Sequence, residues 1–120
     1  MSWIVEYTDE FEGWWSELAE GQQEDVAAGV ELLTTLGPRL PFPHSSGIAN
    51  SRHSHMRELR VQSGGKPLRV FYAFDPRRIV ILLIGGDKTG DDRFYDKYVP
   101  RADDLYDIHL EGLRKEGLIK

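Results

Sequence analysis

The feature that most constrains the fold of this chain is a pair of strand-like segments separated by a four-residue turn. Residues 68–74 alternate with period two, as expected of a β-strand with two different faces. Residues 75–78 (Asp-Pro-Arg-Arg) form a turn with proline at its second position. Residues 79–84 are an unbroken apolar run, typical of a strand buried on both faces. Because a connection this short favours an antiparallel pair, we expect residues 79–84 to be a central strand.

Weaker patterns extend this sheet. Residues 53–61 predict another strand, and Gly64-Gly65 marks the turn that joins it to the next, so three strands should form an antiparallel meander. Residues 3–7 alternate and predict a short first strand. Residues 38–52 contain three prolines and a Ser-Ser-Gly sequence, and we expect a loop there.

Apolar residues at helical spacing predict a helical hairpin after the first strand. Thr8 and Asp9 offer an N-cap, and Asp9 with Glu12 resembles a capping box. A second helix begins near residues 20–21 and ends at Gly37-Pro38, since glycine just past a helix and proline after it are common stop signals.

The C-terminal part predicts further helix. Pro100 suits the first turn of a final helix that ends at Gly117, with a short helix at 92–97 before it. The predicted order is β-α-α-β-β-β-α. We therefore expect one α+β domain over residues 1–120, in which a small, twisted, mainly antiparallel sheet packs against an N-terminal helical hairpin and a C-terminal helix.

The composition excludes several classes of protein. The chain has no cysteine, which excludes disulfides, thiolate nucleophiles and cysteine-ligated zinc, and agrees with a reducing cytosol. Residues 1–6 have neither a basic flank nor a long apolar stretch, so we expect no signal peptide. The longest apolar run, at 79–84, is too short to span a bilayer, and we expect a cytoplasmic protein without a membrane partner.

The charges are distributed unevenly along the chain. The net charge is −5, yet residues 52–101 hold eleven basic and six acidic residues, whereas residues 1–51 hold one basic and nine acidic residues. A local positive field determines where a polyanion docks, even on a protein that is acidic overall. The central segment is therefore the candidate surface for a nucleic acid, although uneven charge is also common in small proteins without such a partner.

Three short blocks and the order of the elements carry a resemblance to a known family. The blocks are Arg-Glu-Leu-Arg at 57–60, Leu-Arg-Val-Phe-Tyr at 68–72 and Leu-Ile-Gly-Gly-Asp-Lys-Thr at 83–89. No block is specific alone, but their order and spacing are. Over roughly residues 3–115, the chain resembles the RelE/ParE-like toxins, and among them the HigB-like, phage-derived branch.

This resemblance implies a RelE-like fold and the toxin of a type II toxin–antitoxin pair. Members of this branch are ribonucleases that cut messenger RNA, usually on the ribosome, and a cognate helix-turn-helix antitoxin blocks them. The chain departs from the branch at one point. The loop after the last strand often carries two adjacent lysines, whereas this chain has Asp87-Lys88, which places an acid beside the expected site.

RNA can be cut without a metal or cofactor if the protein moves protons and stabilises charge on the phosphoryl oxygens. Arginine suits the second task because it binds phosphate through two donors. With the resemblance in view, we predict that Arg69 clamps the scissile phosphate from a sheet face not covered by the main helices, and that Lys88 is catalytic. Arg57 and Arg60 are predicted to bind RNA. Their odd spacing places them on opposite faces of a regular strand, so only one can share the face of Arg69.

Histidine suits the proton transfers because it titrates near neutrality. We predict a catalytic role for His55 and an RNA contact for His53, with a polar loop of no catalytic role as an equal alternative. A His-x-His pair also binds metals, but no third ligand is evident in the sequence, and we predict no metal site.

Two further residues have both a catalytic and a structural interpretation. Asp87 is a candidate base beside Lys88, and a salt bridge to a nearby arginine is the slightly favoured alternative. Tyr95 is predicted to stack on an RNA base, with packing as its alternative.

Two other functions fit the same fold. ParE-like members act on DNA gyrase through protein contacts, and a phage-derived binding module would have no catalysis at all. The ribonuclease hypothesis requires Arg69 and Lys88 to lie close together and on the same side of the protein.

Overall fold

The protein contains one five-stranded mixed sheet, seen in a computed structural model that describes residues 2–120. The strands lie in the order β1 (Val5–Tyr7), β5 (Val80–Asp87), β4 (Lys66–Phe74), β3 (Arg57–Ser63) and β2 (Ser45–Gly47). β1 runs parallel to β5, and all other neighbouring pairs are antiparallel. β3, β4 and β5 form the predicted meander, and the α+β class is confirmed. β5 is an interior strand, as expected, although β4 occupies the middle of the sheet.

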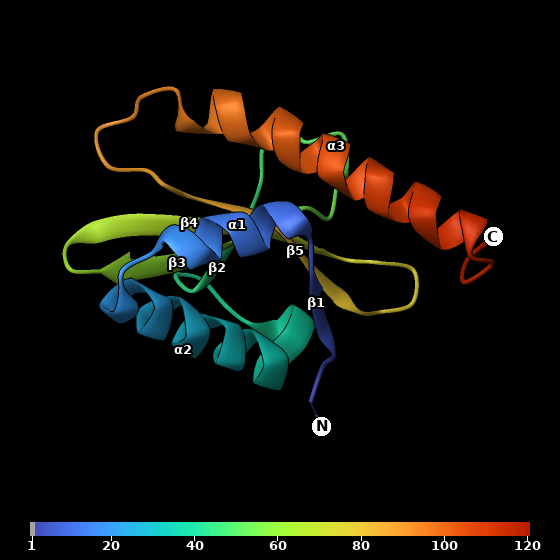
Figure 1. Cartoon of the computed structure of the whole chain (residues 1–120), viewed down its shortest axis with the longest axis horizontal. Helices are drawn as coiled ribbons and strands as arrows, with labels where there is room; N and C mark the ends of the chain where they lie inside the picture. Colours follow the sequence, from blue (N-terminus) through green and yellow to red (C-terminus); the bar gives the residue numbers. More distant parts are fainter. Residues whose placement is uncertain (1) are drawn as a thin grey trace.

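Helices cover both faces of this sheet (Figure 1). α1 (Asp9–Glu17) and α2 (Glu20–Leu36) form the N-terminal helical hairpin and pack on one face, which we call the hairpin face. α3 (Phe94–Lys115) packs on the other, which we call the α3 face. Across residues 2–120, we find no helix with the length and apolar character needed to cross a membrane.

Each face of the sheet has its own hydrophobic core, and β4 shows how the strand period divides them. Val70 and Tyr72 point into the core under the hairpin, whereas Phe71 and Ala73 point into the core under α3. All four side chains are buried. A strand covered on both faces is expected in the middle of a three-layer arrangement. Its register sets the direction of the side chains on its neighbours, except where the pairing with β5 shifts between Phe71 and Tyr72.

The helical hairpin follows its sequence signals. The side chain of Thr8 caps α1 by accepting a hydrogen bond from the backbone N–H of Phe11 at 3.0 Å. α2 ends at Leu36, directly before Gly37 and Pro38, and Gly37 has a positive φ of 56°. Glycine adopts this conformation without steric cost, so the predicted stop signal is confirmed.

The C-terminal helix differs from the prediction of two helices divided at Pro100. α3 is a single helix with Pro100 inside it. An internal proline removes a hydrogen bond and crowds the preceding turn, at a cost of about 3 kcal/mol. The apolar stripe nevertheless continues past it, because Phe94, Val99 and Ala102 all pack into the same core. The burial of apolar side chains before and after Pro100 therefore outweighs the free-energy cost of a proline inside the helix.

We predicted a loop at residues 38–52, but the structure shows that part of this segment is ordered into regular elements. It contains a short 3₁₀ turn (Gly37–Arg39) and the edge strand β2, which pairs with β3. Ser45 is buried and its hydroxyl lies 2.6 Å from that of Tyr72. The Ser-Ser-Gly sequence has no strand pattern of its own, so this strand is stabilised by its tertiary contacts. β3 itself begins at Arg57, four residues later than predicted.

Candidate functional site

A row of side chains crosses the α3 face of the sheet from β2 to β5. Arg60 pairs with Arg69 across β3 and β4, and Arg69 pairs with Gly86 on β5. On the other side, the backbone N–H of Arg60 donates to the carbonyl of His44 at 2.8 Å, just before β2 begins. Residues that are directly opposite on paired strands share a face of the sheet. Because neighbouring strands lie about 4.8 Å apart, the backbones of His44 and Arg69 are roughly 10 Å apart across the sheet.

Arg69 is a buried cation in this row. It is only 4% exposed, and its Nε lies 3.4 Å from Oε1 of Glu58. Its Nη1 donates to the carbonyl of Leu68 at 3.0 Å, while no hydrogen-bond acceptor meets its Nε within residues 2–120. The expectation that Arg69 projects from an uncovered face is therefore wrong, because that face is covered by α3. The guanidinium is held in place by an ion pair rather than solvated.

The carboxylate of Glu58 is the common partner of the site. Besides Arg69, it pairs with Nη1 of Arg60 at 3.6 Å and accepts a hydrogen bond from the hydroxyl of Tyr95 at 2.7 Å. Burial raises the pKa of the Tyr95 hydroxyl, and its bond to Glu58 raises it further. Tyr95 therefore stays protonated at neutral pH and acts as a donor that fixes Glu58.

Lys88 completes the cluster from the loop after β5. It lies two residues beyond Gly86, and its Nζ is 5.4 Å from the centre of the Tyr95 ring. Such a cation–π contact directs the ammonium group toward the α3 face. Arg69 and Lys88 thus lie on the same side of the protein, and both are neighbours of Tyr95. The geometric requirement of the ribonuclease hypothesis is met.

A pocket of about 280 Å³ opens beside the two arginines. Its lining comprises Pro43, His44, Arg60, Gln62 and Arg69. Arg60 is 30% exposed in its side chain and also lies over the ring of Phe42, 5.2 Å from its centre. Two guanidinium groups and the nearby carboxylate of Glu58 give this pocket a net positive charge, and arginine can bind a phosphate through two donors.

Comparison with known proteins gives the family. The model of the phage-derived Gp49-like proteins matches residues 13–107. The chain belongs to this Gp49-like family. It is 39% identical over 93 residues to HigB3, a candidate toxin of Mycobacterium tuberculosis (strain ATCC 25618 / H37Rv), covering 77% of this chain and 80% of that protein.

One more relative and one solved structure extend this comparison. The Gp49-like chain is 34% identical over 112 residues to the candidate toxin HigB2 of the same organism, covering 92% of this chain but only 55% of HigB2, so it spans about half the length of that relative. A double mutant of the E. coli toxin RelE in its free state has a similar structure, with a TM-score of 0.58 at 12% identity over 78% of this chain and 92% of RelE. The fold of the Gp49-like chain is therefore RelE-like.

Asp87, the residue at which the Gp49-like chain departs from the expected lysine pair, points away from the cluster. It pairs with Leu68, which belongs to the hairpin-face core, whereas its neighbour Gly86 pairs with Arg69. The carboxylate accepts hydrogen bonds from the backbone N–H and the hydroxyl of Thr89, at 2.9 and 2.6 Å. These bonds hold the pKa of Asp87 below its usual range, with Lys66 contributing. The favoured arginine salt bridge is wrong, and the acid does not oppose Lys88.

Arg57 lies on the face opposite Arg60, as the odd spacing predicted. Its Nε donates to the hydroxyl of Ser45 at 2.8 Å, and that hydroxyl meets Tyr72 of the hairpin-face core. The structure therefore does not bring Arg57 to the row that contains Arg69, and it leaves Arg60 as the arginine of this pair that shares the pocket.

His53 and His55 are held beside the middle of α3, away from the arginine row. Nε2 of His53 lies 2.8 Å from Oδ1 of Asp107, and Nε2 of His55 lies 3.3 Å from the hydroxyl of Tyr106. Tyr106 is eleven residues beyond Tyr95, or about 16 Å along the helix axis at 1.5 Å per residue. Within residues 2–120, no group of three or more potential ligands is arranged around a metal.

His44 is the site residue that sequence reasoning missed. It lies in the segment that we predicted to be a loop, and only the pairing of β2 with β3 places it opposite Arg60. Its proline-rich surroundings gave no strand signal. A cross-strand neighbour sixteen residues away along the chain cannot be inferred without that register.

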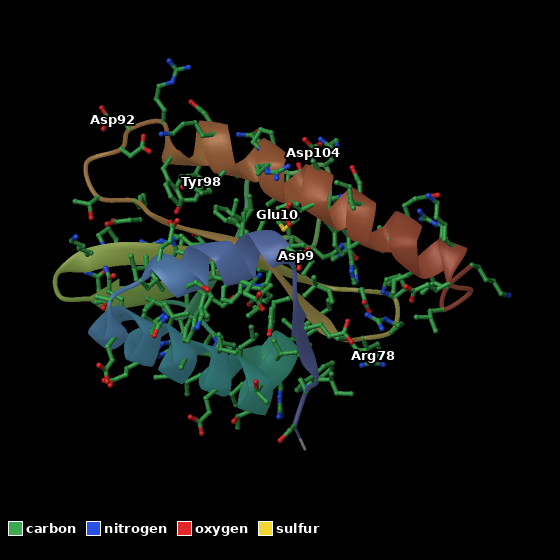
Figure 2. All side chains as sticks on the ribbon, viewed as in Figure 1. Asp9, Glu10, Arg78, Asp92, Tyr98 and Asp104 are labelled. Carbon is green, nitrogen blue, oxygen red and sulfur yellow. The ribbon has the colours of Figure 1, made fainter. Side chains whose placement is uncertain are left out.

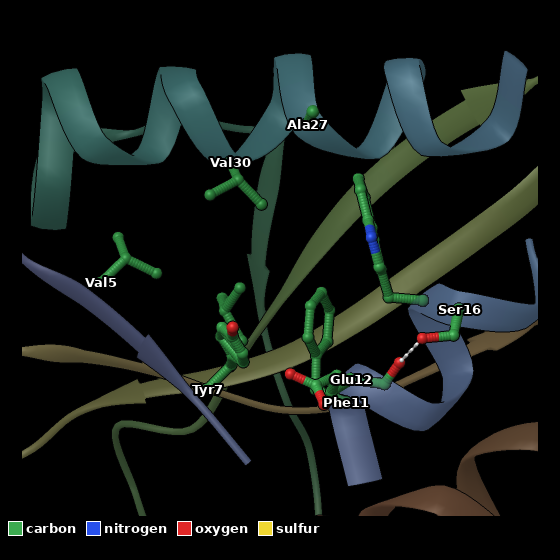
Figure 3. A pocket seen from close by; sticks show the side chains of 9 residues that line it. Val5, Tyr7, Phe11, Glu12, Ser16, Ala27 and Val30 are labelled. Carbon is green, nitrogen blue, oxygen red and sulfur yellow. Dashed lines mark hydrogen bonds between the residues drawn. The ribbon is translucent and has the colours of Figure 1, made fainter. Parts of the chain in front are cut away.

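A larger pocket, of different character, lies on the hairpin face and is unsuited to a polyanion. It has a volume of about 530 Å³ and is bounded by β1, β5, α1 and α2 (Figure 3). Its lining is mostly apolar, including Val5, Phe11 and Val30, and its charged member is the carboxylate of Glu12. Size alone would therefore select the wrong pocket for RNA.

Gly86 allows α3 to approach the row of arginines closely. Figure 2 shows Tyr98 on the side of α3 that faces the sheet. A Cβ at Gly86 would lie 2.6 Å from the Cζ atom of Tyr98. We expect Gly86→Ala to lower the free energy of unfolding by about 2 kcal/mol, because the ring must shift in a packed layer. Urea unfolding at pH 7 measures this change.

The matched control is Gly13→Ala, in α1, where a new Cβ would meet nothing within 4 Å beyond its chain neighbours and the backbone of its own helix. It should raise stability slightly, by about 0.5 kcal/mol, since alanine is the better helix former. Equal stabilities of the two variants would contradict the close approach at Gly86.

Proposed function

We propose that this chain is the toxin of a type II toxin–antitoxin pair and a metal-independent endoribonuclease that cleaves messenger RNA on the ribosome in the cytoplasm. A cognate helix-turn-helix antitoxin blocks it. The observation that carries this proposal is the convergence of Arg60, Arg69 and Lys88 on one face, beside a pocket of about 280 Å³. The relatives named as candidate toxins support the class, and the cation cluster supports the chemistry.

Each cation has a distinct task in this proposal. Arg69, fixed by Glu58, binds a non-bridging oxygen of the scissile phosphate through the edge that faces the pocket. Arg60 is partly exposed and its Glu58 contact is long, so it turns from the carboxylate to the phosphate at little cost. Lys88 adds positive charge from the loop. Together they stabilise the charge that develops on phosphorus as the RNA chain breaks.

The test is induction of the chain in a bacterial host, followed by mapping of new 5′ ends on messenger RNA. We expect growth arrest and new ends within coding sequences that are being translated. Co-expression of a helix-turn-helix protein encoded beside the gene should restore growth. Growth arrest with altered plasmid supercoiling and no new ends would instead indicate a gyrase inhibitor and would contradict the ribonuclease proposal.

A further inference from the structure

We propose that His44 is the general base of this site, the group that takes the proton from the attacking 2′-hydroxyl. This inference rests on the proposed ribonuclease function and adds a residue to it. His44 lines the pocket together with Arg60 and Arg69 and stands at the end of the same cross-strand row. His44 therefore borders the place where those arginines would hold a phosphate.

The position of His44 is fixed by its backbone, which leaves the side chain available. Its carbonyl accepts from Arg60, and its N–H donates to the carbonyl of Pro41 at 2.9 Å. The residue is exposed, and within residues 2–120 its imidazole makes no hydrogen bond. The other three histidines each have a side-chain partner on or beside α3: Asp107 for His53, Tyr106 for His55 and Asp75 for His109.

The remaining titratable groups near the pocket are unsuited to this proton transfer. Glu58 is buried and paired with both arginines. Tyr95 is a protonated donor to Glu58. Asp87 points to the hairpin face. The charged groups that face His44 across the pocket are thus Arg60 and Arg69, with Glu58 between them.

The reaction balances without a metal or redox partner. As the 2′-oxygen forms its bond to phosphorus, its proton passes to the imidazole of His44. The bond between phosphorus and the 5′-oxygen then breaks, and that oxygen takes a proton from water. The products are a 2′,3′-cyclic phosphate and a 5′-hydroxyl end. His44 returns its proton to solvent, which the exposed position of the ring permits.

The experiment measures cleavage of a programmed messenger RNA on purified ribosomes by wild-type protein and by His44→Gln, from pH 5.5 to 8.5. We expect the variant to cleave about 100-fold more slowly or worse, the range of a lost general base. The wild-type rate should rise with pH and then level off, as expected for a reaction that needs a deprotonated base, and this rise should vanish in the variant. A message with a 2′-deoxynucleotide at the cleavage site measures binding, which should be unchanged.

His55→Gln is the matched comparison, because His55 is the histidine that the sequence alone favours and the structure places elsewhere. The assignment of His44 would be overturned if His44→Gln cleaved RNA at the wild-type rate and with the wild-type pH profile. It would also be overturned if only His55→Gln lost cleavage. Loss of binding together with cleavage would also overturn it, since a base is not needed to bind RNA. If the wild-type protein made no cuts, the ribonuclease proposal itself would fail. Thermal unfolding shows whether each variant is folded.

Discussion

Replacement of Arg69 by methionine is expected to slow messenger RNA cleavage about a thousandfold, the upper end of what a single charge-stabilising donor contributes. Arg69 is at the centre of the cation cluster, between Arg60 and Gly86 in the cross-strand register. Methionine keeps much of the aliphatic length and fills the same space, so the variant removes the guanidinium with little change in packing. The measurement is the rate of appearance of the mapped 5′ ends on programmed ribosomes.

The single variant also has a stability effect that must be separated from catalysis. Glu58 and Arg69 are both buried, and removing only the arginine leaves a buried carboxylate that has lost its nearest cation. The expected cost is about 3 kcal/mol. The double variant Glu58→Gln with Arg69→Met removes both charges and should recover most of that stability. It should remain inactive, because no guanidinium returns to the phosphate position.

Arg114→Met is the charge-matched control, since Arg114 is a solvent-exposed arginine in the last turn of α3. It should cleave at the wild-type rate. A folded double variant that cleaves as fast as wild type would show that Arg69 is a structural cation and would remove it from the mechanism. A double variant as unstable as Arg69→Met alone would contradict the buried ion pair.

From the sequence, strand periodicity predicted which side chains of the site share a face of the sheet, but not their burial or their partners. Alternation along residues 68–74 gave the direction of Arg69 relative to Val70, and the odd spacing of Arg57 and Arg60 correctly separated them. It did not predict that Arg69 is buried. That depends on how far α3 extends over the sheet, which local signals misjudged at Pro100.

The partners of the charged residues were the least predictable part. Asp87 follows Gly86 directly, yet one step along a strand turns its carboxylate to the hairpin face, where Thr89 binds it. The acid beside Lys88 in sequence is thus not beside it in space. His44 lies beside Arg60 because β2, which follows it, pairs with β3, and the residues of β2 have no preference for strand structure. Such placements are set by the packing of distant segments rather than by local pattern.

Asp75 is the second position where we expect a large effect, in this case on stability. Its fully buried carboxylate accepts hydrogen bonds from Nε and Nη2 of Arg77, at 3.0 and 2.7 Å, and lies 2.9 Å from Nε2 of His109. Arg77 also pairs with Glu6 on β1. One carboxylate therefore joins the turn between β4 and β5 to α3 and to the edge strand.

Asp75→Asn should lower the free energy of unfolding at pH 7 by about 3 kcal/mol, because the amide keeps the shape but leaves Arg77 and His109 without their anion. The melting temperature should fall by roughly 10 °C for a chain of this size. Asp107→Asn is the matched control. Asp107 also pairs with an arginine and a histidine, but it is 48% exposed, and its loss should cost less than about 1 kcal/mol.

The pH dependence gives an independent check on this role of Asp75. Burial alone would raise the pKa of its carboxyl, but the hydrogen bonds from Arg77 and His109 outweigh burial and hold the pKa below its usual value. A carboxyl with a lowered folded-state pKa contributes its full stabilisation above the unfolded value of about 3.9 and loses it as the pH falls further. The stability gap between wild type and Asp75→Asn should therefore narrow as the pH falls below about 4. A gap that stayed the same down to pH 2 would mean that the variant loses packing rather than an ionised anchor.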